Sequence, residues 1–226
     1  MDSAAERLGR VMERIEKAAR RSSRNPQDIT LVAVTKTFSF EHILPFLQAG
    51  VRHIGENRVQ EALSKYQNPD GSRRVAGATL HLIGQLQSNK ARKAVDFFDM
   101  IQSLDRMDLA QDVNRHAQAA GRVMPCLLEV KISAETTKTG LDPEKLNDFL
   151  AQAKTLSAVS IKGLMGIAPL TKTPEEARPF FRRLRQLFEK TKLEILSMGM
   201  SADFEAAIEE GSTMVRIGTA LFGSRA

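Results

Sequence analysis

Several residue types are scarce in this chain of 226 residues, which has no tryptophan, one tyrosine and one cysteine. A single cysteine excludes an internal disulfide framework. Because Cys126 falls within an apolar strand pattern, we interpret it as a buried structural thiol in a protein of a reducing compartment. No apolar run approaches the roughly 20 residues that span a bilayer, and no signal-peptide pattern occurs. We therefore expect a cytoplasmic protein without a membrane contact.

The chain also lacks zinc-ligand spacing and any repeat of a nucleic-acid-binding module. Its net charge is +6, but the basic residues are mixed with acidic ones over most predicted helices, as is typical of a solvated surface. The hypothesis of an RNA-binding module therefore rests on charge alone. We expect neither nucleic acid nor a metal ion as a ligand. Glu6, Glu13 and Glu16 are interleaved with the arginines near the amino terminus, which favours a mature helix over a transit peptide.

Short apolar runs alternate with amphipathic segments along the chain. Strands are predicted at 31–36, 51–55, 79–84, 100–103, 124–132, 161–167, 194–197 and 213–217. Helices are predicted at 3–22, 40–48, 57–66, 88–95, 106–120, 143–156, 174–190 and 202–210, with a last one cut short near residue 226. Eight strands, each followed by a helical segment, predict one α/β domain over residues 1–226. This domain would be a (β/α)8 or TIM barrel with an extra amino-terminal helix.

The first predicted strand ends on Lys36. In a parallel barrel the carboxyl ends of all the strands meet at one face, where this fold places its ligand chemistry. A lysine at a strand end, taken alone, is more often one that reaches water along its apolar stem. The neighbours expected at the same face make Lys36 a candidate binding residue.

Two turns rich in small residues follow the seventh and eighth strands. They read SMGMSAD (197–203) and RIGTA (216–220). Glycines, the hydroxyls of Ser201 and Thr219, and the N–H groups at helix starts are what a phosphate group requires. For either turn alone, Gly199 and Gly218 could simply turn the chain and Ser201 could cap a helix. Here both turns occur together, and they follow the two strands whose loops form the usual phosphate site of this fold. This favours a phosphate ligand.

A lysine at one end and a phosphate site at the other fit pyridoxal 5′-phosphate (PLP), with a Schiff base on Lys36. Arg216, at the end of the eighth strand, could then face the pyridine nitrogen, where its positive charge would disfavour ring protonation. The alternative is that Arg216 pairs with a carboxylate at the edge of the core.

Seven sequence blocks carry a close resemblance to a known family over nearly the whole length. They are VAVTK (32–36), IGENRVQEA (54–62), HLIGQLQSNKAR (81–92), IQSLDR (101–106), TGLDPE (139–144), KGLMGIAP (162–169) and LSMGMSADFEAAIEEGSTMVRIGTALFGSR (196–225). On these blocks the chain resembles the YggS/PROSC family of PLP homeostasis proteins, which are similar in fold to the barrel domain of alanine racemase and belong to fold type III of PLP proteins.

The resemblance implies the Schiff base on Lys36 and assigns further contacts to the cofactor. Asn57 would contact the ring, Met200 and Met165 would line the pocket, and Arg216 would lie near the pyridine nitrogen. The phosphate contacts would come from Ser201, Gly218 and Thr219. His81 would shape the mouth of the site rather than transfer protons.

Two positions depart from the family pattern: Arg58 stands where tyrosine is frequent, and Lys131 stands where asparagine is common. Neither belongs to the phosphate turns, but Lys131 sits at a strand end and could change what the mouth admits.

The resemblance implies a PLP carrier that buffers the cofactor or delivers it to apoenzymes, with effects on amino-acid and keto-acid balance and with no catalytic residue. A racemase needs a second base on the opposite face of the cofactor, and the one tyrosine, Tyr66, lies at the far end of a predicted helix. The enzyme alternative is an amino-acid racemase, or a related PLP enzyme, that uses water or Lys36 as its sole base. Without the second domain of the racemases, a monomer is expected.

Overall fold

In the computed structural model, residues 2–133 and 139–223 are described. Eight strands form a closed parallel barrel in which each strand pairs with its sequence neighbours and β8 pairs with β1. The strands are β1 (Thr30–Val34), β2 (His53–Glu56), β3 (Thr79–Leu82), β4 (Met100–Leu104), β5 (Met124–Glu129), β6 (Val159–Met165), β7 (Ile195–Ser197) and β8 (Met214–Ile217). This closure confirms the predicted (β/α)8 barrel.

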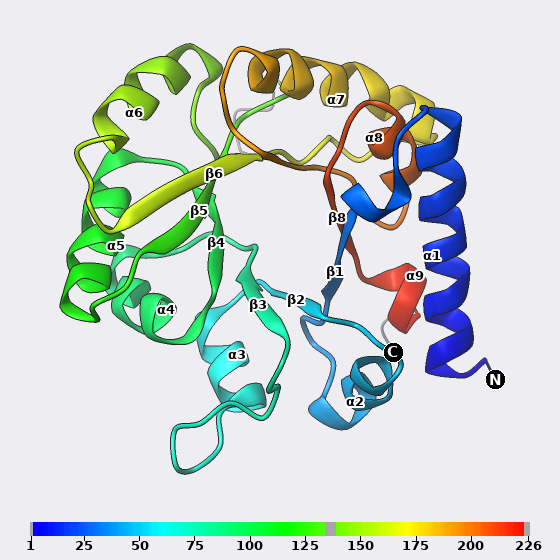
Figure 1. Cartoon of the computed structure of the whole chain (residues 1–226), viewed down its shortest axis with the longest axis horizontal. Helices are drawn as coiled ribbons and strands as arrows, with labels where there is room; N and C mark the ends of the chain where they lie inside the picture. The colour runs from blue at the N-terminus through cyan, green and yellow to red at the C-terminus, as the bar shows by residue number, and fades with distance from the viewer. Residues whose placement is uncertain (1, 134–138, 224–226) are drawn as a thin grey trace.

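Helices surround the barrel on its outside (Figure 1). They are α1 (Ala4–Arg21), α2 (Phe40–Gln48), α3 (Val59–Tyr66), α4 (Ala91–Phe97), α5 (Met107–Ala119), α6 (Leu146–Ala153), α7 (Pro174–Glu189), α8 (Phe204–Glu209) and α9 (Thr219–Phe222). Short 3₁₀ turns precede β1, α4 and α6. Most of the loop predicted for 133–140 lies outside the described residues.

The extra amino-terminal helix α1 lies along α8 and α9 and reaches α2 (Figure 1). It begins with a capping box between Ser3 and Glu6 and buries an apolar stripe that includes Val11 and Ile15. Because α9 has only four residues, it cannot cover the β8–β1 side of the barrel alone. Helix α1 completes the outer layer there.

The apolar core has two parts. One large cluster fills the layer between the sheet and the helices, and it contains Cys126, which is fully buried with its thiol pKa raised to about 12 by burial. A smaller set of buried apolar side chains is separate from this cluster and consists of Val32, Val34, Leu127, Met165 and Met214. Buried polar side chains share the barrel strands with this second set, namely His81, Gln102, Ser197 and Arg216. The outer face of the sheet is therefore mainly apolar, and its interior is partly polar.

The predicted boundaries differ from the observed ones mainly at strand ends. The first and fifth strands were expected to reach residues 36 and 132, but β1 ends at Val34 and β5 at Glu129. The chain turns at Lys36 and Thr37, and Thr37 has a φ of 70° that a strand cannot contain. The helix expected at 202–210 begins only at Phe204. Among the described residues, no helix has the length and apolarity that crossing a membrane requires.

The close contact of β6 and β7 gives a stability prediction. A Cβ at Gly163 would lie 1.9 Å from the carbonyl oxygen of Ile195, its partner in the sheet, so the strands would have to separate. We expect Gly163→Ala to lower the free energy of unfolding by about 1–3 kcal/mol in urea denaturation, as overpacking typically does.

Gly9→Ala is the matched control, because Gly9 lies inside α1 and no atom stands within 4 Å of an added Cβ. This variant should gain about 0.5–1 kcal/mol from helix propensity. Equal effects of the two substitutions would contradict the steric argument.

Candidate functional site

One cavity of about 320 Å³ opens at the carboxyl ends of the strands, within the size range of small-molecule sites. All seven cofactor-binding residues predicted from the sequence line it, namely Lys36, Asn57, Met200, Ser201, Arg216, Gly218 and Thr219. Further lining residues include Val34, Phe38, Ile83, Ile167 and Ala202, which the sequence did not single out. Most of these apolar residues lie at or just beyond a strand end, which was the signal that could have identified them. Met165, expected in the pocket, is fully buried at the end of β6 and does not line it.

The turn that carries Lys36 is held by side chains of β2 and α3. The buried Thr35 hydroxyl donates to Glu56 Oε1 (2.7 Å), and the Tyr66 hydroxyl donates to Thr35 Oγ1 (2.8 Å). The Lys65 amine donates to the Thr35 carbonyl (2.8 Å) and to Glu56 Oε1 (2.7 Å). The residue before Lys36 is therefore fixed through both its backbone and its side chain.

The residue after Lys36 is fixed as well. Thr37 adopts a left-handed backbone conformation that is strained for a β-branched residue. Its N–H donates to Glu61 Oε1, which also accepts a hydrogen bond from the Lys65 amine at 3.1 Å. We call Glu56, Glu61, Lys65 and Tyr66 the lysine-turn clamp. The sequence did not indicate this clamp, apart from the spacing of Glu61 and Lys65, which suits an ion pair within a helix.

The turn after β7 differs from the prediction. Gly199 has a φ of 93°, and an added Cβ there would lie 2.5 Å from Ala207 Cβ. The Met200 N–H donates to Asp203 Oδ1 at 2.6 Å, which closes a tight turn and delays α8. Ser201 therefore does not cap that helix. Glycine is required at position 199, because this residue has a positive φ and no room for a side chain.

Ser201 instead joins the two predicted phosphate turns. Its hydroxyl oxygen accepts hydrogen bonds from the N–H groups of Gly218 and Ala220, both at 3.2 Å, at the start of α9. Hydroxyl and N–H groups thus converge on one small region of the cavity wall, as an anion site requires. Gly218 has an ordinary φ of −113°, so its lack of a side chain matters for close approach and not for strain.

Arg216 is 4% exposed and lies in the wall of the same cavity. Its guanidinium donates to Ser197 Oγ (2.7 Å) and to the carbonyl of Gly166 (3.0 Å). Within the part of the chain that the structure describes, no carboxylate forms an ion pair with Arg216, so the alternative of a carboxylate-paired arginine at the core edge is not what is observed. Burial lowers the Arg216 pKa to about 10, against the opposing effect of Glu129 and Asp203, and the group stays charged at neutral pH.

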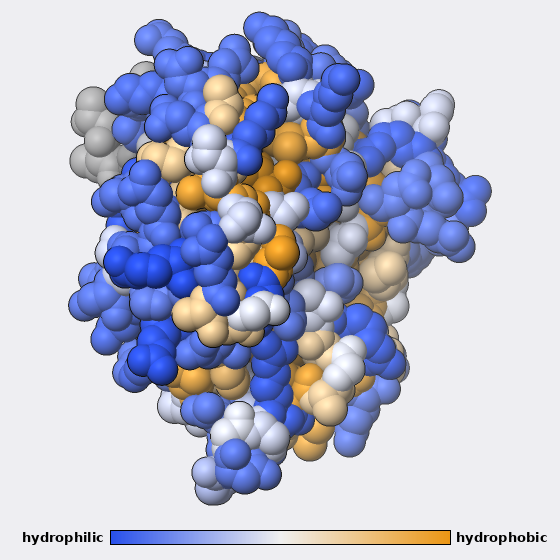
Figure 2. Space-filling model, turned by 60° about the vertical axis from the view of Figure 1, so that its left-hand side comes forward, coloured by the Kyte–Doolittle hydropathy of each residue, from blue (hydrophilic) through white to orange (hydrophobic). Residues whose placement is uncertain are grey.

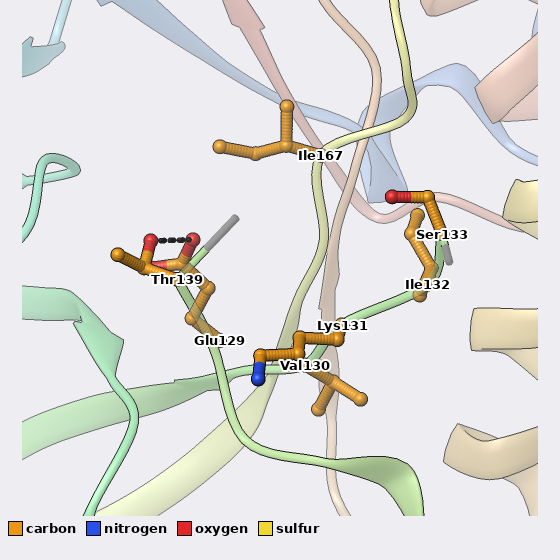
Figure 3. Close-up of a pocket in the computed structure, with 7 residues that line it drawn as sticks. All are labelled: Glu129, Val130, Lys131, Ile132, Ser133, Thr139 and Ile167. Carbon is orange, nitrogen blue, oxygen red and sulfur yellow. Dashed lines mark hydrogen bonds between the residues drawn. The ribbon is translucent and has the colours of Figure 1, made fainter. Parts of the chain in front are cut away.

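A neighbouring pocket of about 280 Å³ shares Ile167 with the cavity (Figure 3). On one side of it the Thr139 hydroxyl donates to Glu129 Oε1 at 3.2 Å, and burial raises the Glu129 pKa. Lys131, one of the two departures from the family pattern, lines this pocket and pairs with Asp142 at 3.1 Å. It does not line the cavity.

The outer surface seen in Figure 2 is mostly hydrophilic, with hydrophobic residues gathered near the middle of that face.

Arg58, the second departure from the family pattern, is exposed and lies beside Asn57 in another pocket. Met200, in the cavity wall, is 39% exposed.

The fold and the cavity define a (β/α)8-barrel protein with a lysine-centred small-molecule site at the carboxyl ends of its strands. Residues 6–226 match the family model described as the alanine racemase amino-terminal domain. A PLP homeostasis protein from Aquifex aeolicus is 42% identical over 229 residues, covering 99% of each chain.

Two solved structures extend the comparison. PipY from Synechococcus elongatus PCC7942, solved with PLP bound, is 40% identical with a TM-score of 0.79, covering 93% of this chain and 100% of that one. Alanine racemase from Clostridium difficile 630 is 14% identical with a TM-score of 0.72, covering all of this chain but 57% of the enzyme, and shows a shared fold alone. The chain belongs to the family of PLP homeostasis proteins, and the resemblance predicted from the seven sequence blocks is confirmed.

The lysine-turn clamp gives a prediction about stability and pH. Lys65 is 7% exposed and Glu56 is fully buried, so Lys65→Met leaves the Glu56 carboxylate without its counter-charge. Loss of one partner of a buried ion pair costs about 3–5 kcal/mol, which urea denaturation at pH 8 should show.

Lowering the pH should reduce the loss of unfolding free energy in the Lys65→Met variant. Burial raises the Glu56 pKa, and Oε2 has no hydrogen-bond partner among the described residues, so a proton there breaks no bond. An acid whose pKa is higher in the folded than in the unfolded state stabilises the fold as pH falls. Lys17→Met, which removes an exposed pair with Glu13, is the control and should change stability by at most about 0.5 kcal/mol at either pH. A pH-independent deficit in the Lys65 variant would argue against a buried carboxylate as its cause.

Proposed function

We propose that this protein binds PLP as a Schiff base on Lys36 and acts in intracellular PLP homeostasis, by buffering or delivering the cofactor. The observation that carries this proposal is the convergence of all seven predicted residues on one cavity. The names of the relatives and the PLP bound by PipY support it. The donor set fits the cofactor, because an amine, a buried cation and an anion site line the same wall.

Each residue has a distinct part in this binding. Lys36 would hold the cofactor covalently, because bound PLP would supply an aldehyde that condenses with the amine and releases one water molecule. Ser201, Gly218 and Thr219 hold the phosphate through hydroxyl and N–H groups. Asn57 contacts the ring, Met200 lines the pocket, and Arg216 lies near the ring nitrogen.

Arg216 limits the chemistry that this site supports. Bound PLP supplies an aldehyde that condenses with amines and a ring that withdraws electrons. The buried positive charge of Arg216 disfavours a proton on the ring nitrogen, and an unprotonated ring withdraws electrons less strongly. The site therefore favours holding the cofactor over reacting with it.

A second acid or base is also missing from the cavity wall in the described part of the chain, where Lys36 and Arg216 are the titratable lining residues. Tyr66 is fully buried beneath the Lys36 turn, and burial together with Glu56 raises its pKa. It cannot serve as the second base of a racemase. This supports a carrier that affects amino-acid and keto-acid balance with little or no catalysis.

The proposed partners are PLP and apo PLP-dependent enzymes in the cytoplasm, with neither nucleic acid nor a membrane involved. The protein is proposed to act as a monomer. Many arginines on the outer helices already pair with glutamates, including Arg14 with Glu205 and Arg182 with Glu210, which weakens the case for a basic RNA-binding surface.

The cofactor site is tested by absorption spectroscopy. The purified protein with added PLP should show a band near the visible edge, and borohydride should convert it into a covalent adduct on Lys36. Lys36→Ala should lose both, whereas Lys131→Ala, a lysine of the neighbouring pocket, should keep both. A protein that stays colourless with PLP would overturn the proposal.

Carrier and enzyme are separated by solvent exchange. The PLP-loaded protein is incubated with a broad panel of amino acids in deuterated water, and proton NMR follows the α-proton. We expect no exchange above the level of free PLP, because the described cavity wall offers no second base. Exchange that depends on Lys36 would favour the racemase alternative.

A further inference from the structure

A continuous chain of hydrogen bonds crosses the barrel from the cavity to β2. Arg216 Nη1 donates to Ser197 Oγ at 2.7 Å, and Ser197 Oγ donates to Gln102 Oε1 at 2.7 Å. Gln102 Nε2 lies 3.0 Å from His81 Nδ1, and His81 Nε2 lies 3.0 Å from His53 Nδ1. Ser197, Gln102 and His81 are at most 1% exposed. We call these five residues the barrel chain.

The Arg216 guanidinium at one end of the barrel chain sets the direction of every hydrogen bond in it. A guanidinium has donors only, so Ser197 Oγ accepts from Arg216 and gives its own proton to Gln102 Oε1. This fixes the Gln102 amide with its NH₂ group towards His81. His81 Nδ1 must then accept.

A second contact supports this orientation of the amide. Gln102 Nε2 also lies 3.2 Å from the sulfur of Met214, which is a weak acceptor and suits an N–H donor. With the amide reversed, its oxygen would face that sulfur, and the Ser197 proton would have no acceptor in the described part of the chain. Both protons of the amide nitrogen are therefore used.

The same logic sets the proton positions on both histidines. Burial and the neighbouring His53 lower the His81 pKa to about 3, against the opposing effect of Asp99, so the ring is neutral at physiological pH. A neutral ring that accepts at Nδ1 carries its proton on Nε2 and donates it to His53 Nδ1. His53 is half-buried, and burial lowers its pKa, which favours the neutral ring. Because its Nδ1 then accepts from His81, its own proton belongs on Nε2.

We propose that Ser197, Gln102 and His81 are positioning residues for Arg216, and that their one-way hydrogen bonds hold both histidines in the Nε2–H form. A neutral hydroxyl and the Gly166 carbonyl anchor the guanidinium, so its direction is fixed. No carboxylate of the described residues bonds it, and Glu129 and Asp203 act on its pKa only from farther away. The consequence for bound PLP rests on the proposed function: the ring nitrogen would face a cation of fixed direction that bonds no carboxylate of the described residues, and it would stay unprotonated.

The first test needs no ligand. Nitrogen-15 NMR of the four histidines at pH 7.5 should show His81 with an unprotonated Nδ1 and a protonated Nε2, the resonance being assigned by its loss in His81→Asn. Ser197→Ala removes the link between arginine and amide, so His81 should shift to a mixture of tautomers. Ser212→Ala is the matched control, because Ser212 is equally buried and all the partners of its hydroxyl among the described residues are backbone carbonyls.

A proton on Nδ1 of His81 in the unsubstituted protein would overturn the proposal. An unchanged tautomer in Ser197→Ala would overturn it equally. Ser197→Thr keeps a hydroxyl and should restore the single tautomer, which separates the hydrogen bond from a packing defect.

The second test uses PLP labelled with nitrogen-15 in the ring. In the loaded protein the ring nitrogen should be unprotonated at pH 7, and in Ser197→Ala its pKa should rise by about one unit as Arg216 loses its anchor. An identical ring pKa in both proteins would contradict the positioning role. A single His81 tautomer in a protein that fails to take up PLP would remove the proposed function but leave the barrel chain intact.

Discussion

The pairing of β8 with β1 is the constraint on which the rest of this structure depends. Val32 lies opposite Arg216 and Ala33 opposite Ile217, so the two ends of the sheet meet in one fixed register. This register brings the Lys36 turn beside the Gly218 turn, although they lie far apart in the sequence. A shift by one residue would turn Arg216 away from the interior, because successive strand residues face opposite sides. Helix α1 covers this seam from outside, so the extra helix supports the site through the barrel's closure.

The buried polar groups divide into two networks with different tasks. The lysine-turn clamp lies outside the sheet, between β2 and α3, and fixes the backbone on both sides of Lys36. The barrel chain lies inside the sheet and fixes the side chain of Arg216. Buried polar groups are costly unless they are hydrogen-bonded, and among the described side chains Glu56 Oε2 is the exception without a partner. The backbone around Lys36 and the side chain of Arg216 are thus held by two separate networks.

Two buried titratable groups outside the cavity wall, His81 and Tyr66, are poorly matched to proton transfer at neutral pH. A general base works best with a pKa near the operating pH. Burial instead pushes the His81 pKa down to about 3 and raises the Tyr66 pKa, so neither group exchanges a proton readily at neutral pH. Arg216 remains charged. The cavity therefore combines the Lys36 amine with the fixed positive charge of Arg216, as the proposed reversible binding of an aldehyde requires.

Local sequence determined the elements and most of the cavity wall. The apolar run before Lys36, the small-residue turns around Gly199 and Gly218, and the alternation of strands and helices each depend on neighbours in the chain. Together they predicted the barrel and five of the lining residues, whereas Asn57 and Met200 followed only from the family resemblance. The clamp on the Lys36 turn, the link from Ser201 to Gly218 and the barrel chain were decided only by the tertiary structure. Their partners come from different strands and helices, and periodicity within one segment carries no information about which distant side chain will face it.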